Sequence, residues 1–299
     1  MNLSPSMTDA HDVIELSPTT LLAERSVSMS NALARAAQNL DLNEKRLIAI
    51  GLAKTDSMSQ QGLALAANAG WKLTLNAQEY ADEFGVTTST AYKQLRSACE
   101  HLYERSIGFV VPGKVKGSGK KADTVRRWRW VSAVEYSEGE GYVQLNFSPE
   151  IAPHLLGLRH RFTSYKLKQA ARFDTVYAWR LYELLKSWSD TGRWSPTVEE
   201  FNEIMETPPS FRADFKALRV RCIEPSVETL NAKAGLVVSW KPLRYGARKV
   251  SALEFVFAPV AQSDLFGPEA PEDLGVLVSA EDLLGSAEAS ASSGPRGER

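Results

Sequence analysis

The sequence has few cysteines and histidines, the residues that cross-link small folds through disulfides or bind transition metals. Its 299 residues include two cysteines and four histidines. Cys99 and Cys222 lie far apart, which excludes a disulfide framework and a zinc site built on cysteines, and is typical of a reducing cytoplasm. The histidines form neither a His-x-His pair nor a His-Glu-x-x-His pattern. We therefore expect no bound metal and no cofactor.

Long apolar runs and catalytic motifs are also missing. No stretch reaches the roughly 18 apolar residues of a membrane helix, and residues 1–25 lack the basic start and apolar run of a secretory signal. There is no Gly-x-Ser-x-Gly motif. The segment from Gly113 to Lys121 departs from a phosphate-binding loop in its spacing and in having lysine where serine or threonine is required. A cytoplasmic protein without catalytic activity is predicted.

The net charge of −1 conceals an uneven distribution. Residues 1–30 carry four acidic and one basic residue, a balance of −3, and residues 260–299 carry eight acidic and two basic, a balance of −6. The remaining 32 basic and 24 acidic residues give residues 31–259 a balance of +8. A basic body with acidic ends indicates a polyanionic partner such as nucleic acid, although an ordinary solvated surface can carry the same charge.

Two parts of the chain share one order of predicted elements, in which helices are followed by a hairpin. In the first part, helices are predicted over 41–54, 76–84 and 87–104, with strands over 107–111, 125–134 and 141–147. In the second part, helices are predicted over 174–188, 197–206 and from 211, with strands over 193–195, 236–240 and 249–257. The repeated order predicts an α+β fold of two tandem winged-helix domains.

The domain boundaries follow from the repeated order of elements and, for the tail, from composition. We expect a flexible segment over residues 1–28, a first winged-helix domain over 29–150 and a second over 151–260. Residues 261–299 are rich in alanine, serine, glycine and glutamate, which predicts a disordered acidic tail.

The first domain contains a helix-turn-helix candidate. Gly85 provides the turn between its two helices. The apolar positions of the second helix are expected to face inward; these are Ala91, Leu95, Ala98 and Leu102. Ser89, Lys93 and Arg96 fall on the opposite face, which can lie against a DNA duplex. The alternative is a solvated helix that only packs on its neighbour.

The third helix of the second domain carries a similar division. An apolar stripe is formed by Phe211, Phe215, Leu218 and Cys222. Arg212, Lys216 and Arg219 form a second stripe, from which arginine can reach guanine edges or phosphates. The alternative is a charged solvent face. Pro225 is expected to kink or end this helix.

Two basic segments are candidates for contacts with the DNA backbone. Arg244, Arg248 and Lys249 surround Gly246 in a predicted hairpin turn, which suits a wing that grips phosphate or the minor groove; an ordinary basic turn is an equal alternative. The lysine-rich loop over 114–121 suits a non-specific phosphate contact.

Several blocks of sequence carry a family resemblance in their order. The blocks are Ser30–Ala36, Leu40–Leu47, Ala91–Leu95, Leu102–Ile107, Phe162–Tyr165, Arg180–Lys186, Phe215–Val220 and Arg248–Val250. Together they resemble the iteron-binding plasmid replication initiators, or Rep proteins, over about residues 28–258. The order of the blocks is more specific than any one of them.

The resemblance implies a bacterial cytoplasmic protein that binds tandem repeats at a plasmid origin and helps to melt it. It implies that the second domain reads most of the bases, while the first adds backbone contacts and carries dimerisation. Monomers are expected to open the origin, and dimers to repress the protein's own gene at its promoter. The host initiator and replicative helicase are expected partners.

The start of the acidic tail resembles a second known motif. Gln262, Leu265 and Phe266 match the Gln-x-x-Leu-Phe peptide that docks in the bacterial sliding clamp, although five-residue matches also arise by chance. Two other functions stay open: a winged-helix transcriptional regulator without a role in initiation, and a module that binds protein partners.

Overall fold

The structure is a computed structural model, which describes residues 21–111, 124–136, 140–245 and 249–260. The predictions for residues 1–20, for the loop over 114–121, for Arg248 and for the tail beyond residue 260 lie outside the described residues. Among the described helices, none is long and apolar enough to cross a membrane.

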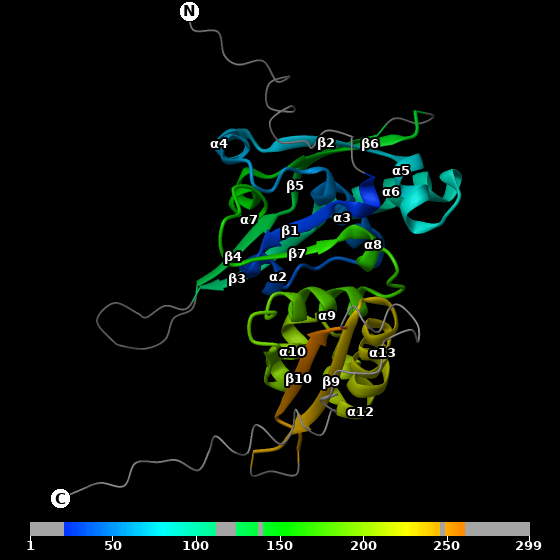
Figure 1. The fold of residues 1–299 in the computed structure, drawn as a ribbon. Coiled ribbons are helices and arrows are strands. Elements are labelled where there is room, and N and C mark those ends of the chain that lie inside the picture. The colour runs from blue at the N-terminus through cyan, green and yellow to red at the C-terminus, as the bar shows by residue number, and fades with distance from the viewer. Residues whose placement is uncertain (1–20, 112–123, 137–139, 246–248, 261–299) are drawn as a thin grey trace, which may run out of the picture. The chain divides into compact units, whose positions relative to one another are not determined.

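The described part of the chain begins with a short 3-10 helix η1 (Leu22–Glu24), strand β1 (Ser26–Ser30) and helix α2 (Asn31–Arg35). Strand β1 pairs antiparallel with β7 (Phe162–Lys166), from Ser26 opposite Lys166 to Ser30 opposite Phe162, as Figure 1 shows. Residues 22–24 and 26–28, which were expected to be flexible, therefore lie in regular structure. Local periodicity does not reveal β1, because its partner strand lies far along the chain.

The predicted helices of the first module are confirmed. Helix α3 (Leu42–Lys54) begins at Asp41 with a reciprocal capping box, as does α5 (Ala77–Phe84) at Asn76. Helix α5 ends at Gly85, whose φ of 64° is left-handed, and α6 (Thr88–Glu104) follows. Helix α4 (Gln60–Ala69) was not predicted.

The strands of this module form two sheets. Strands β2 (Trp71–Asn76), β6 (Tyr142–Phe147) and β5 (Val131–Tyr136) form one in the order β2-β6-β5, while β3 (Ser106–Val111) pairs with β4 (Thr124–Arg129). The prediction of a single strand over 125–134 is wrong, because this segment is divided between β4 and β5. The chain leaves one sheet for the other at Trp130, which is fully buried and donates its indole N–H to the carbonyl of Gln38 at 3.1 Å.

Gly70 joins α4 to β2 in a backbone conformation that only glycine adopts readily. Its φ is 73°, and a Cβ there would collide with the carbonyl oxygen of Phe147. After β6 the chain forms the short helices η2 (Pro149–Ile151) and α7 (Ala152–Leu155), and α8 (Leu167–Ala170) follows β7. In α7, His154 lies against the rings of Phe109 and Trp128, with centroids 5.2 and 5.5 Å away.

The second module contains helices α9 (Val176–Lys186), α10 (Val198–Ile204), α11 (Pro209–Ala213), α12 (Phe215–Leu218), the π-helical η3 (Arg219–Ile223) and α13 (Glu224–Lys233). Its strands β8 (Arg193–Trp194), β9 (Leu236–Leu243) and β10 (Ala252–Pro259) form a sheet in the order β8-β10-β9. Trp194, Phe201 and Phe255 pack their rings together in its core. In Figure 1 the β9–β10 hairpin lies beside α13.

A buried charged cluster joins α3 to α9; its members are Gln38, Lys45, Tyr165, Arg180 and Glu183. The Lys45 ammonium donates to Glu183 Oε2 and to Gln38 Oε1, each at 2.6 Å, and Tyr165 donates to Glu183 Oε1 at 2.6 Å. Arg180 lies 3.2 Å from Glu183 Oε2 and donates to the carbonyls of Ala34 and Ala36. Burial lowers the pKa of Lys45 to about 8, against the opposing effect of Glu183.

Candidate nucleic-acid interface

The longest continuous helical segment of the second module runs from Phe215 to Lys233 and is called the reading helix below. Asp214 precedes it with extended backbone (φ −132°, ψ 108°), and its side chain accepts a hydrogen bond from the backbone N–H of Lys216 at 2.9 Å. This cap starts a new helix. The prediction of a single helix that starts at Phe211 is therefore wrong, because Phe211 and Arg212 belong to the separate helix α11.

Pro225 neither ends the reading helix nor leaves it regular. A proline has no N–H, so the carbonyl of Arg221 loses its usual donor four residues later. Just before the proline the helix forms a π-turn, in which the N–H of Glu224 donates to the carbonyl of Arg219, five residues earlier. Ser226 then donates its hydroxyl to the carbonyl of Cys222 at 2.6 Å. The predicted kink is thus a widened turn, and the helix continues to Lys233.

The reading helix carries three exposed basic residues. Lys216 and Arg219 lie three residues apart, as predicted, and Arg221, which sequence reasoning missed, is exposed as well. Two residues correspond to about 200° in a regular α-helix, so Arg221 lies on the other flank of the exposed surface from Arg219. Arg219 lies 3.5 Å from Glu224 at the surface, a weak pair that a phosphate or a base can displace.

Arg212 has a different position from the one predicted. It lies on α11, where its Nε donates to the carbonyl of Thr207 at 2.8 Å and its Nη2 to the carbonyl of Asn202 at 3.2 Å. These bonds tie α11 to the end of α10. Arg212 therefore does not share a helix with Lys216 and Arg219, and its guanidinium already has partners within the module.

The hairpin tip between β9 and β10 carries the predicted wing residues. Arg244 and Lys249 are exposed. Tyr245 beside them is 72% exposed, and its backbone N–H bonds to the hydroxyl of Ser251 at 3.4 Å. An exposed aromatic ring between basic residues can contact sugar or base as well as phosphate.

The first module presents its candidate residues on α6. The inward positions Ala91, Leu95, Ala98 and Leu102 are buried as predicted. Ser89 and Lys93 are exposed near the start of the helix. Arg96 is engaged at the surface: its Nε lies 3.3 Å from Glu100, and its guanidinium lies 4.9 Å from the ring centre of Tyr136. The Tyr136 hydroxyl and Arg96 together lower the pKa of Glu100.

Strand β4 adds exposed cations to this module. Arg126 and Arg127 are exposed, while Arg129 lies against the Tyr103 ring and pairs with Glu104 at 3.4 Å. The side chain of Trp128 is turned to the other side, where its ring lies 4.8 Å from that of Phe109. Trp128 therefore packs within the first module.

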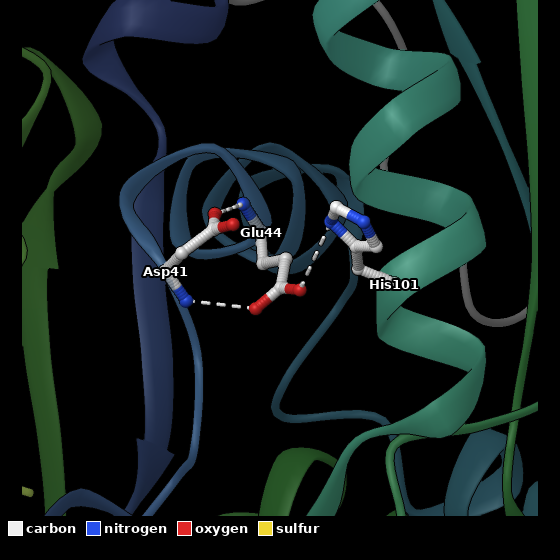
Figure 2. Close-up of side chains that lie close together, drawn as sticks. All are labelled: Asp41, Glu44 and His101. Atoms are coloured by element: carbon white, nitrogen blue, oxygen red, sulfur yellow. Dashed lines mark hydrogen bonds and ion pairs between the residues drawn. The ribbon is translucent and has the colours of Figure 1, made fainter.

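A cluster of Asp41, Glu44 and His101 has the donor types of a metal site (Figure 2). Its atoms already have partners. The backbone N–H groups of Glu44 and Asp41 donate to each other's carboxylates at 2.9 and 2.7 Å, and Arg105 donates to Glu44 at 3.0 Å. Burial is the main cause that raises the pKa of Glu44, and Arg105 opposes it. Helix capping and the contacts of Glu44 with Arg105 and His101 therefore account for this cluster.

Comparison with known proteins gives two matched family models and several relatives. Residues 26–186 match the model described as "Initiator Replication protein, WH1", and residues 197–257 match "Initiator Rep protein, WH2". The two predicted winged-helix domains are thereby confirmed. Two Escherichia coli proteins are similar: an uncharacterized 27.6 kDa protein at 25% identity (72% of this chain, 88% of that one) and the PI protein at 23% (81% and 85%).

A solved structure shares the fold. It is the crystal structure of Pi initiator protein in complex with iteron DNA, with a TM-score of 0.63 and 21% identity, covering 79% of this chain and 98% of that one.

Proposed function

The chain belongs to the initiator replication protein family, and from this premise we propose that it binds tandem DNA repeats at a plasmid origin and initiates replication there. The family consists of DNA-binding initiators rather than known enzymes. The observation that carries the proposal is the set of exposed basic residues on the reading helix, Lys216, Arg219 and Arg221, in the same module as a basic hairpin tip.

The proposed readout follows from side-chain chemistry. Arg219 and Arg221 each present a fork that can bond two acceptors of guanine in the major groove. Lys216 and the wing residues Arg244, Arg248 and Lys249 neutralise phosphates, which adds affinity without sequence information. Arg212 acts mainly by tying α11 to the end of α10.

We also propose a division of labour between the modules. The second reads the bases, while the first adds backbone contacts through Ser89, Lys93 and Arg96 and carries dimerisation. We propose that the boundary between the two domains lies at the end of β7 and not at residue 150, because β7 pairs with β1 of the first module. Binding that spans successive grooves bends the duplex and favours melting of an adjacent A·T-rich segment.

The remaining proposed steps involve partners. Dimers bind the protein's own promoter and repress its gene, and monomers act at the origin in the bacterial cytoplasm. The host initiator and replicative helicase are recruited there, and Gln262, Leu265 and Phe266 bind the sliding clamp. Clamp binding that persists after Leu265→Ala and Phe266→Ala would contradict the last step.

Fluorescence anisotropy tests origin recognition. Labelled direct-repeat DNA from beside the gene is compared with a shuffled duplex over a salt series. We expect at least a ~10³-fold preference for the repeats. Arg219→Ala should cost about 1–3 kcal/mol on the repeats and reduce this preference, whereas Lys249→Ala should weaken both duplexes alike. Lys72→Ala, on β2, is the matched control for loss of a surface charge.

The outcomes separate the candidate functions. Equal binding to repeats and shuffled DNA would contradict origin recognition, and no binding at low salt would favour a module for protein partners. Repeat binding without replication of a cloned repeat-bearing fragment would favour a transcriptional regulator.

A further inference from the structure

Val220 is an exception on the reading helix. Its side chain is 46% exposed, between the exposed residues Arg219 and Arg221. Five other apolar side chains of the helix are buried in the module core, namely Leu218, Cys222, Ile223, Val227 and Leu230. Core packing therefore does not account for a branched apolar side chain at position 220.

Three successive side chains of the reading helix are exposed together, namely Arg219, Val220 and Arg221. Successive residues of a helix are rotated by about 100° each, so Arg219 and Arg221 lie on either flank of Val220. A turn closed by a bond from residue 224 to residue 219 holds more residues, and its rotation per residue is slightly smaller. Val220 therefore lies at the middle of the exposed surface, between the two arginines. Pro225 enforces this turn because it has no N–H to restore the regular bond.

The side chains of Arg219, Val220 and Arg221 match the chemical groups that neighbouring guanine and thymine bases expose in the major groove. Arginine recognises the two acceptors of guanine in the major groove, and the 5-methyl group of thymine is the apolar group exposed there. A valine side chain offers no hydrogen bond and can gain only by covering apolar surface. We propose that Val220 contacts the 5-methyl group of a thymine beside a guanine read by Arg219 or Arg221. This inference rests on the proposed origin recognition.

Uracil substitution isolates this one methyl group. Each thymine of the repeat is replaced in turn by deoxyuridine, which lacks only the 5-methyl group, and full-length protein is titrated by anisotropy. At one thymine we expect about a fourfold loss of affinity for the unsubstituted chain, the effect of one methyl group left in water. Val220→Ala should bind the thymine and uracil duplexes equally at that position.

A control variant and two possible results decide whether the uracil sensitivity is due to Val220. Val237→Ala, which truncates a 60% exposed valine on β9, should keep the uracil sensitivity of the unsubstituted chain. If Val220→Ala keeps it too, or if no thymine position is sensitive, the assignment of Val220 is overturned while origin recognition stands, since repeat preference is measured in the same titrations. Failure of the unsubstituted chain to prefer the repeats would overturn both proposals.

Discussion

Replacing Lys45 by methionine tests the buried cluster that joins α3 to α9. Methionine keeps much of the length of the side chain but removes its charge. Glu183 then loses the cation 2.6 Å from its Oε2 and keeps Arg180 at 3.2 Å and the Tyr165 hydroxyl, while Gln38 Oε1 loses its Lys45 donor. The side chains of Lys45 and Glu183 are at most 1% exposed, so water cannot replace the lost ammonium.

The expected loss of folding stability follows from the partners that Glu183 keeps and the one that it loses. Removing one partner of a buried ion pair costs about 3–5 kcal/mol. Because Arg180 and Tyr165 remain on Glu183, we expect the lower end, about 3 kcal/mol. For a module of this size, a loss of 1 kcal/mol lowers Tm by about 2–4 °C, so Lys45→Met should lower Tm by about 6–12 °C.

Thermal and urea unfolding followed by circular dichroism measure this loss. The matched control is Lys72→Met, which removes a surface lysine 3.0 Å from Glu135 and should cost less than about 1 kcal/mol. Adding Glu183→Gln to Lys45→Met should recover part of the stability, because it removes the buried charge left without its lysine. Equal losses in Lys45→Met and Lys72→Met would refute the reasoning.

Three further predictions concern backbone conformation, pH and the two arginines. Gly70→Ala should lose clearly more stability in urea than Gly85→Ala, since both have left-handed φ but an added Cβ meets other atoms only at Gly70; equal losses would argue against the steric account. Burial lowers the pKa of His154 below 6.5, so the unfolded chain takes up a proton first as pH falls, and stability due to the neutral ring is lost below about pH 6.5. His154→Gln should flatten this part of the Tm–pH profile, and an unchanged slope would contradict it. Arg212→Ala should lower Tm, whereas Arg219→Ala should keep Tm and reduce repeat preference; the reverse pattern in melting and anisotropy would exchange their roles.

Local signals predicted much of the fold. The capping boxes at Asp41, Asn76 and Thr197 each occupy four neighbouring residues, so the sequence contains everything that defines them. Strand β1 could not be found in this way, since its hydrogen-bond partners lie in β7. The break at Trp130 was missed for a related reason: residues on both sides have strand character, and only burial against Gln38 separates them.

The candidate site was predictable to the extent that the helix is regular. Lys216 and Arg219 were found on one face because they lie three residues apart. Arg212 was placed beside them only because the cap at Asp214 was overlooked. Arg221 was missed because it lies two residues from Arg219, whereas the predicted stripe joined only residues three or four apart. Val220 was missed because an apolar side chain is ordinarily assigned to the core.

The pairing of β1 with β7 sets an order of events during synthesis. The hydroxyls of Ser28 and Ser164 lie 2.9 Å apart across 136 positions of chain. At about 5–20 residues per second, the N-terminal strand waits roughly 7–27 s for its partner to be made. During that interval the β1 edge is open to another strand. A gene fragment that stops before residue 162 would leave β1 in this state permanently, so the N-terminal half of the chain should be prone to aggregation when expressed alone.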